Sequence, residues 1–415
     1  MALILVFVAG YLLIALEAVT KINKAGIALL MSALLWMMGI QSHPNEATHA
    51  LAESLSSSSE ILFFLLGAMT IVELIDAHQG FEVVTRFLNY NQKKTLTWLI
   101  ALLSFFLSAL LDNLTTTIVM VTIIRKIIPE KRDRQLLAGL TVIASNAGGA
   151  WSPVGDVTTT MLWIGEQISP SGVILNVFIP SLICLILPTW MIASSMKGTI
   201  AQAPHTVNSS DSSIRQKTVL IAGICVLFAV PVIKQTTGLP PYMGILCGLG
   251  IMWVLLEWLD RKNVAENRSK FTVERALQRI DTPSILFFLG ILLSIGALEM
   301  QGSLQLLASH LNASLPDDKT LVISLGVLSA ILDNVPLVAA AQGMFDLQTW
   351  LPDTLNWHLL AFTSGTGGSI LVIGSAAGVA AMGLEDLSFG WYLKKISLPA
   401  LIGFLAGCAY FLLIY

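Results

Sequence analysis

Ser108-Ala-Leu-Leu-Asp-Asn113 and Ser329-Ala-Ile-Leu-Asp-Asn334 are near copies of one motif, and each lies in the middle of a long apolar stretch. An ionised carboxylate at the centre of a membrane segment costs roughly 2.5 to 3.5 kcal/mol on insertion scales. A chain that places one there twice, in the same local sequence, is expected to use both. Asp112 and Asp333 are therefore the first candidates for a functional site.

The composition is that of a polytopic membrane protein. Of the 415 residues, 55% are hydrophobic and only 12% are charged, whereas charged residues make up about a quarter of a soluble domain. Apolar runs long enough to cross a hydrocarbon core of about 30 Å recur along the whole chain and leave no segment for a soluble domain. No basic patch suggests nucleic acid as a partner. The sequence contains neither a nucleophile paired with a base nor residues at a metal-ligand spacing, so an enzyme is poorly supported.

Two apolar stretches, residues 97–124 and 320–345, fit poorly as single straight helices. Each would be roughly 40 Å long as one helix, and each is interrupted at its centre by Asp-Asn. Two short arms that meet at a polar tip fit better, so we predict two re-entrant hairpins. The Asp-Asn pair could also act only as the cap that starts the second arm.

Charged residues beside these hairpins predict that they open to opposite faces of the membrane. Cations flank the first hairpin on both sides, which places both of its ends in the cytoplasm, whereas mainly acidic residues flank the second. The segment 46–60 is acidic and is predicted to be external, with serines 56–59 as a helix-start cap. The cations are Arg86, Lys93, Lys94, Arg125, Lys126, Lys131, Arg132 and Arg134, and the acidic residues are Asp317, Asp318, Asp346 and Asp353.

The chain is predicted to be an all-α inverted repeat with about ten spanning helices plus the two hairpins. An odd number of spans separates Ile61-Leu-Phe-Phe-Leu65 from its copy Ile285-Leu-Phe-Phe-Leu289, which inverts the second half. The first predicted repeat is 1–195, with hairpin 97–124 and broken helix 136–163. The second is 218–415, with hairpin 320–345 and broken helix 358–382. A cytoplasmic linker at 196–217 is predicted to join them.

Each hairpin is followed by a span that small and polar residues interrupt at mid-depth. Glycine pairs at 148–149 and 367–368, next to Ser, Asn and Pro153, predict unwound helices whose freed carbonyls need a partner other than lipid. A bound cation is one candidate partner. Close helix packing is the alternative explanation for the glycines.

Hard cations such as sodium bind several oxygen ligands at once, as in calcium and magnesium sites. We predict sodium ligands at both hairpin tips and both helix breaks, and we predict that Asp112, Asp156 and Asp333 couple cation to proton movement. The first half is richer in ligands and is the stronger candidate. The predicted ligands are Ser108, Asp112, Asn113, Ser145, Asn146, Gly149, Asp156 and Thr158 in the first half, and Ser329, Asp333, Asn334, Ser364, Thr366 and Gly368 in the second.

These residues suggest a secondary transporter. A carboxylate removed from water retains a proton readily, and a cation that arrives beside it displaces that proton. Competition for one site gives exchange when only the loaded forms cross the membrane, which is the logic of an antiporter. The alternative is a sodium-coupled carrier or efflux protein for a small anion such as a dicarboxylate, citrate or arsenite.

At these motifs the chain resembles the ion transporter superfamily, and most closely its NhaD-type sodium/proton antiporters. The resemblance rests on Ser108-Ala-Leu-Leu-Asp-Asn-Leu-Thr115, on Ser145-Asn-Ala-Gly-Gly-Ala-Trp-Ser-Pro-Val-Gly-Asp156 and on their second-half counterparts. Carboxylate carriers of the superfamily typically have Ser-Asn-Thr where this chain has Asp-Asn, and paired anionic side chains would repel a dicarboxylate.

The resemblance implies exchange of cytoplasmic Na⁺ or Li⁺ for external H⁺ without a cofactor. It also implies a homodimer, embedded in the lipid of a bacterial-type inner membrane, whose protomers each have a scaffold and a transport domain.

Overall fold

The fold is helical throughout the described chain. The computed structural model describes residues 2–15, 17–42, 44–81, 92–199, 210–261, 272–315 and 317–414, and within these ranges the only β-structure is an isolated bridge between Gln92 and Thr199. The predicted all-α membrane class is confirmed. Seven of the described helices are long and apolar enough to cross a membrane: α3 (Lys24–Ser42), α4 (Pro44–Ala77), α10 (Pro170–Ser195), α11 (Ser210–Thr237), α12 (Pro241–Arg261), α14 (Thr282–Met300) and α21 (Ser397–Ile414).

Three further predicted spans are shorter or interrupted helices. The first is α1 (Ala2–Ala15), which is followed by the short α2 (Glu17–Thr20). The other two are broken at the glycine-rich positions, as α8 (Lys131–Ala150) with α9 (Val157–Ile164), and as α18 (Leu355–Gly367) with α19 (Ala376–Glu385). Together with the seven long helices they correspond to the ten predicted spans.

Each predicted hairpin consists of two helices that meet at the Asp-Asn motif. The first is α6 (Lys93–Ser108) with α7 (Asn113–Ile127), and the second is α16 (Asp318–Leu328) with α17 (Asn334–Met344). Asp112 and Asp333 are the N-caps of α7 and α17, so the capping role is real. The opposite orientation of the hairpins and the inverted repeat stay predictions.

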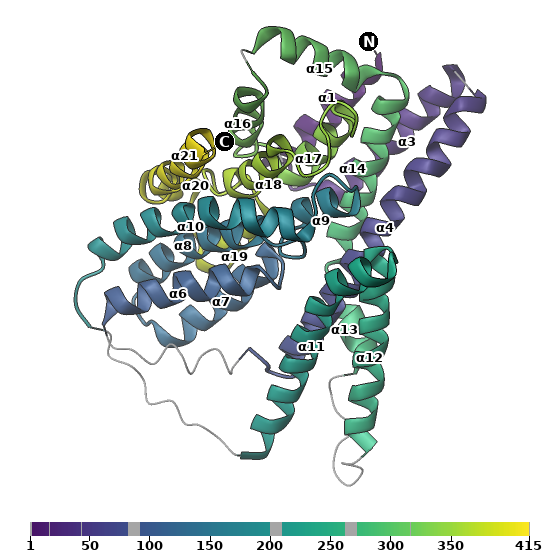
Figure 1. Ribbon diagram of the computed structural model, residues 1–415. Coiled ribbons are helices and arrows are strands. Elements are labelled where there is room, and N and C mark those ends of the chain that lie inside the picture. Colours follow the sequence, from purple (N-terminus) through teal and green to yellow (C-terminus); the bar gives the residue numbers. More distant parts are fainter. Residues whose placement is uncertain are drawn as a thin grey trace.

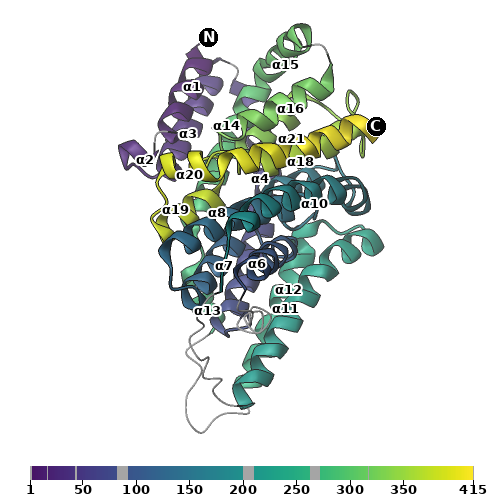
Figure 2. The ribbon, with the colours of Figure 1, turned by 90° about the vertical axis from the view of Figure 1, so that its left-hand side faces the viewer.

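The helices form two bundles, and each bundle draws on both halves of the sequence. In Figure 1, α3, α4, α11, α12 and α14 run steeply together, while α6 to α10 and α16 to α21 form a second group. The packing agrees, because α14 contacts α3 and α4, whereas α8 contacts α6, α7 and α10. Figure 2 shows the same division after a quarter turn. The remaining short helices are α13 (Val273–Arg279), α15 (Ser303–Ser314) and α20 (Phe389–Lys395).

Two predicted boundaries differ from the structure. The segment 46–60 is not a separate connection, because α4 runs through it from Pro44, and the predicted cap role of serines 56–59 is wrong. Ser57 and Ser59 instead donate hydrogen bonds to the carbonyls of Glu53 and Leu55, 3.1 and 2.6 Å away, so these polar residues are satisfied inside a helix. In the predicted linker 196–217, α11 begins at Ser210. Residues 200–209 and the flanking Arg86 lie outside the described residues.

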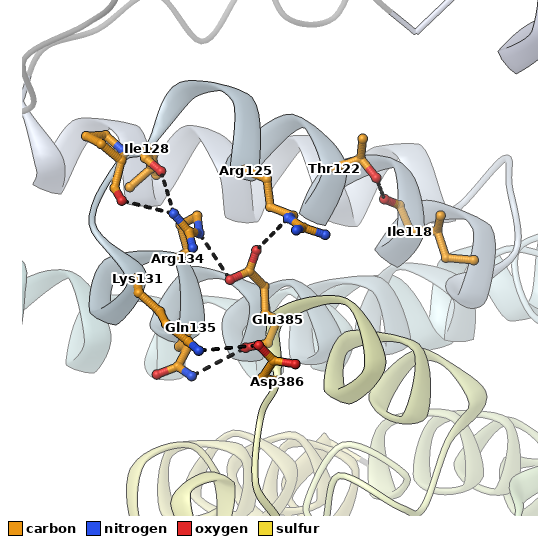
Figure 3. Close-up of polar contacts among 10 residues, drawn as sticks. Ile118, Thr122, Arg125, Ile128, Lys131, Arg134, Gln135, Glu385 and Asp386 are labelled. Atoms are coloured by element: carbon orange, nitrogen blue, oxygen red, sulfur yellow. Dashed lines mark hydrogen bonds and ion pairs between the residues drawn. The ribbon is translucent and has the colours of Figure 1, made fainter.

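An ion-pair cluster around the buried Glu385 joins the end of α19 to the end of α7 and the start of α8 (Figure 3). The Glu385 side chain is 2% exposed, and its two oxygens lie 3.3 Å from Arg125 Nε and 3.1 Å from Arg134 Nε. Lys131 Nζ lies 3.3 Å from the neighbouring Asp386 carboxylate. The sequence had assigned these cations only to a membrane face. The contacts place the connection after α19 at the same end of the molecule.

Candidate cation site

A cavity of about 60 Å³ lies between the two bundles, where both hairpin tips meet the break after α8. Its wall contains three carboxylates and two amides, Asp112, Asp156, Asp333, Asn113 and Asn334. All five are predicted site residues from separate parts of the sequence, and the structure brings them together. The space is large enough for water or a small ion.

Asp112 uses both carboxylate oxygens to accept hydrogen bonds from one residue of α7. Thr115 N lies 2.8 Å from Oδ1, and Thr115 Oγ1 lies 2.6 Å from Oδ2. No cationic side chain pairs with Asp112 in the part of the chain that the structure describes. Its charge is therefore held by a cap alone and remains available to a cation.

Asp156 opens α9 without capping it, since its side chain accepts no hydrogen bond from that helix. The residue is 2% exposed, and its Oδ2 accepts a hydrogen bond from Asn334 Nδ2 at 3.3 Å. Helix α18 approaches the same oxygen at Gly365, where an added Cβ would lie 3.5 Å away. The carboxylate of the first half is thus held by groups of the second half.

A chain of buried amides and a hydroxyl links the two helix breaks. Asn113 Nδ2 donates to Asn146 Oδ1 at 2.9 Å, and Asn146 Nδ2 donates to Ser375 Oγ at 3.0 Å. Ser375 is the N-cap of α19 and accepts the amide of Gly378. Ser375 is not among the ligands predicted from the sequence.

Asp333 differs from the other two carboxylates because it has a cationic partner. Lys24 Nζ lies 2.9 Å from Asp333 Oδ2, with side-chain exposures of 25% and 17%. The same ammonium group lies 4.2 Å from the centre of the Phe287 ring. Sequence analysis did not predict this pair, because Lys24 and Asp333 are far apart in the chain. The two halves of the site therefore differ in charge.

The remaining predicted ligands mostly brace the hairpins against the broken helices. Ser108 Oγ donates to the carbonyl of Ser145 at 2.7 Å, and Ser329 Oγ donates to the carbonyl of Ser364 at 2.9 Å, so the two halves repeat one contact. Thr158 Oγ1 is buried and has no hydrogen-bond partner among the described residues. The predicted ligands that do not line the cavity are Ser108, Ser145, Asn146, Gly149, Thr158, Ser329, Ser364, Thr366 and Gly368. Their ligand role stays a prediction.

The glycines at the breaks allow close approach of backbone to backbone. A Cβ added at Gly148 would collide with the carbonyl oxygen of Phe105, and one added at Gly367 would collide with that of Gly326. The packing explanation is therefore correct for these two glycines. The carbonyl of Gly149 already accepts the amide of Trp151, which leaves it less free as a cation ligand.

Known proteins resemble the whole chain. A sequence profile described as citrate transporter (CitMHS) matches residues 11–367. Sodium/proton antiporter 1 of Arabidopsis thaliana is 48% identical over 100% of this chain and 72% of its own length, and sodium/proton antiporter 2 of the same plant is 46% identical over 99% of each. The Na⁺/H⁺ antiporter NhaD of Vibrio cholerae serotype O1 is 32% identical over 92% of this chain and 84% of its own length.

Proposed function

The chain belongs to the citrate transporter family and, within it, to the sodium/proton antiporters, and on that premise we propose that it exchanges cytoplasmic Na⁺ or Li⁺ for external H⁺. It is a multi-pass membrane transporter and not an enzyme. The transported ions are substrates, and no cofactor enters the mechanism.

One observation carries the proposal, namely that three carboxylates and two amides surround one small cavity between the bundles. Carboxylate and amide oxygens are the ligands that hard cations prefer. Because Lys24 neutralises Asp333, the carboxylates of Asp112 and Asp156 are left to bind either a cation or protons. We assign the coupling to this pair, with Asp333 and its lysine as a fixed neighbour.

The exchange follows from competition at this pair. Open to the cytoplasm, the site releases its protons and binds Na⁺ at Asp112 and Asp156, with the amide oxygen of Asn113 as a further ligand. Open to the outside, it releases Na⁺ and is protonated again. The change of access requires the bundle with both hairpins to move against the bundle that contains α4 and α14. The position of the cavity on the boundary between the bundles supports that movement.

Transport of citrate or a dicarboxylate is not favoured, although the family takes its name from a citrate transporter. The cavity wall carries three carboxylates against one lysine, so a multivalent anion would be repelled.

The assembly and the membrane of this protein are further parts of the proposal. We propose a homodimer, which cross-linking in native membranes would test. We also propose a bacterial-type inner membrane, although the named relatives come from a plant as well as from bacteria.

Replacement of Asp112 by Asn tests the proposal, because Asn is as good an N-cap as Asp but carries no charge. In everted vesicles, addition of Na⁺ or Li⁺ should dequench a pH-sensitive dye with the parent protein and not with Asp112→Asn. No response of the parent protein between about pH 6 and 9 would contradict the antiporter assignment.

Asp317→Asn is the matched control. Asp317 caps α16 through Thr320 N in the way that Asp112 caps α7 through Thr115 N. This hydrogen bond lowers the pKa of Asp317, which is therefore ionised, so the substitution to Asn removes a charged cap here too. It lies away from the cavity, and the variant should exchange normally.

A further inference from the structure

A second and larger cavity of about 550 Å³ lies between the same two bundles. Its wall contains three carboxylates, Glu53 and Glu60 of α4 and Glu299 of α14, together with the hydroxyl of Ser58. We propose that this cavity, which we call the glutamate vestibule, is the outer binding station for monovalent inorganic cations and protons that exchange with the carboxylate cavity. The inference rests on the exchange function proposed above.

Helix α4 runs past both cavities with one face. Its vestibule residues end at Ile61, and its carboxylate-cavity residues begin at Phe64 and Leu65. Residues three and four apart lie on the same side of an α-helix. The wall of the vestibule therefore continues directly into the wall of the carboxylate cavity.

The other shared helices repeat this order. On α14, Phe288 lines the carboxylate cavity and Leu292 lines the vestibule, one turn further along. On α17, Val335 and Ala339 are related in the same way. One turn of helix is about 5.4 Å. The two cavities are thus stacked, and an apolar layer that includes Phe64 and Leu292 separates them.

The chemistry of the vestibule favours cations. None of its three glutamates forms an ion pair with another described residue, and the nearby Lys234 instead donates to the carbonyl of Trp163 at 3.2 Å. Ser58 is 4% exposed, lines the vestibule and makes no hydrogen bond within the described chain. Because this hydroxyl has no partner and is accessible from the cavity, it is free to contact a cation or water in the vestibule.

A recess with charges of a single sign and low-dielectric walls raises the local concentration of counter-ions. Glu299 faces the vestibule close to α17, since a Cβ added at Gly343 would lie 3.7 Å from its Oε2. The three carboxylates come from α4 and α14 of one bundle, and Glu299 lies next to α17 of the other, at the boundary along which the bundles would move.

The vestibule belongs to the outer face. It lies at the N-terminal part of α4, whereas the carboxylate cavity lies beside the C-terminal part and also contacts Lys24. The positive-inside rule places Lys24 and the cations around Lys131 in the cytoplasm, so the acidic end of α4 is external.

Thiol labelling tests access to the vestibule independently of transport. In a background with Cys184, Cys225, Cys247 and Cys408 replaced by Ser, Ser58→Cys should react from the outer face with a membrane-impermeant cationic methanethiosulfonate. Thr70→Cys is the control, because Thr70 lies on the same helix, is buried and lines neither cavity. Absence of outer labelling at position 58, or labelling only from the cytoplasm, would overturn the proposal.

Charge removal tests the role of the carboxylates. In proteoliposomes, the combined variant Glu53→Gln, Glu60→Gln and Glu299→Gln should raise the half-saturating Na⁺ concentration on the vestibule side by roughly tenfold at low ionic strength, and by much less in high salt. The half-saturating concentration on the cytoplasmic side should not change. Glu46→Gln removes an exposed carboxylate from the same helix and should match the parent protein.

The outcomes separate the two proposals. If the parent protein does not exchange sodium for protons, the proposed function fails, and labelling at position 58 still decides whether the vestibule is open to the outside. If the parent exchanges normally and the triple variant behaves like Glu46→Gln, the vestibule proposal is wrong.

Discussion

Neutralising Lys24 should destabilise the protein, because it leaves the Asp333 carboxylate without its cation beside the carboxylate cavity. The two charged groups are 2.9 Å apart, and their side chains are 25% and 17% exposed. Two unit charges about 4 Å apart attract by roughly 4 kcal/mol at an effective dielectric of 20. Breaking a fully buried pair costs about 3–5 kcal/mol. The partial exposure lowers this value, so Lys24→Gln should reduce the free energy of unfolding by about 2–3 kcal/mol.

A double-mutant cycle isolates the pair from other effects of the substitution. Lys24→Gln with Asp333→Asn removes both charges and should regain most of the lost stability, which corresponds to a coupling energy of about 2 kcal/mol. Unfolding of the detergent-solubilised protein would be followed for the parent, both single variants and the double variant. Lys21→Gln is the control, because Lys21 is exposed and forms no ion pair with a described residue.

Two results would refute this reasoning. If Lys24→Gln unfolds like the parent protein, the ion pair contributes no stability. If the double variant is as unstable as Lys24→Gln, the loss comes from contacts of Lys24 other than Asp333, such as its position over Phe287.

Three further predictions concern the ion pairs of Glu385, the glycines at the helix breaks, and the competition between Na⁺ and protons. Glu385→Gln should lower the free energy of unfolding by about 1–3 kcal/mol, because it leaves two arginines without their buried carboxylate. The control Asp386→Asn, at a side chain that is 81% exposed, should change it by less than about 0.5 kcal/mol. Equal effects of the two substitutions in thermal unfolding would contradict this prediction. Gly148→Ala should destabilise the protein by about 1–3 kcal/mol, because the added Cβ collides with the Phe105 carbonyl. The control Gly383→Ala, with open space around the added Cβ, should stabilise the protein by up to about 1 kcal/mol. If Gly148→Ala is as stable as the parent protein, the two backbones can move apart at the break. The apparent affinity for Na⁺ should fall about tenfold for each unit of decreasing pH when one proton competes with the cation, and an affinity independent of pH in vesicle titrations would exclude competition.

Local sequence was enough to identify the helices and the residues at their interruptions. Asp112 and Asp333 were found because a charged residue in an apolar run is costly wherever it lies. The helix breaks followed from glycine pairs and Pro153, whose effect on the backbone acts within a few residues. The segment 46–60 was misassigned for the same reason, because its polarity suggested a connection, whereas hydroxyls that bond to carbonyls one turn back kept it in α4.

The all-α membrane class, the interrupted helices with their carboxylates and the glycines at the breaks could be predicted locally, since each depends on the chemistry of neighbouring residues. Tertiary packing, by contrast, brings Asn334 to Asp156 and Lys24 to Asp333. The same packing makes one face of α4 line both cavities. These features depend on which helices pack side by side. Charge and hydrogen-bond energies depend on distance in space, and local sequence patterns do not encode the separation of residues that are far apart in the chain.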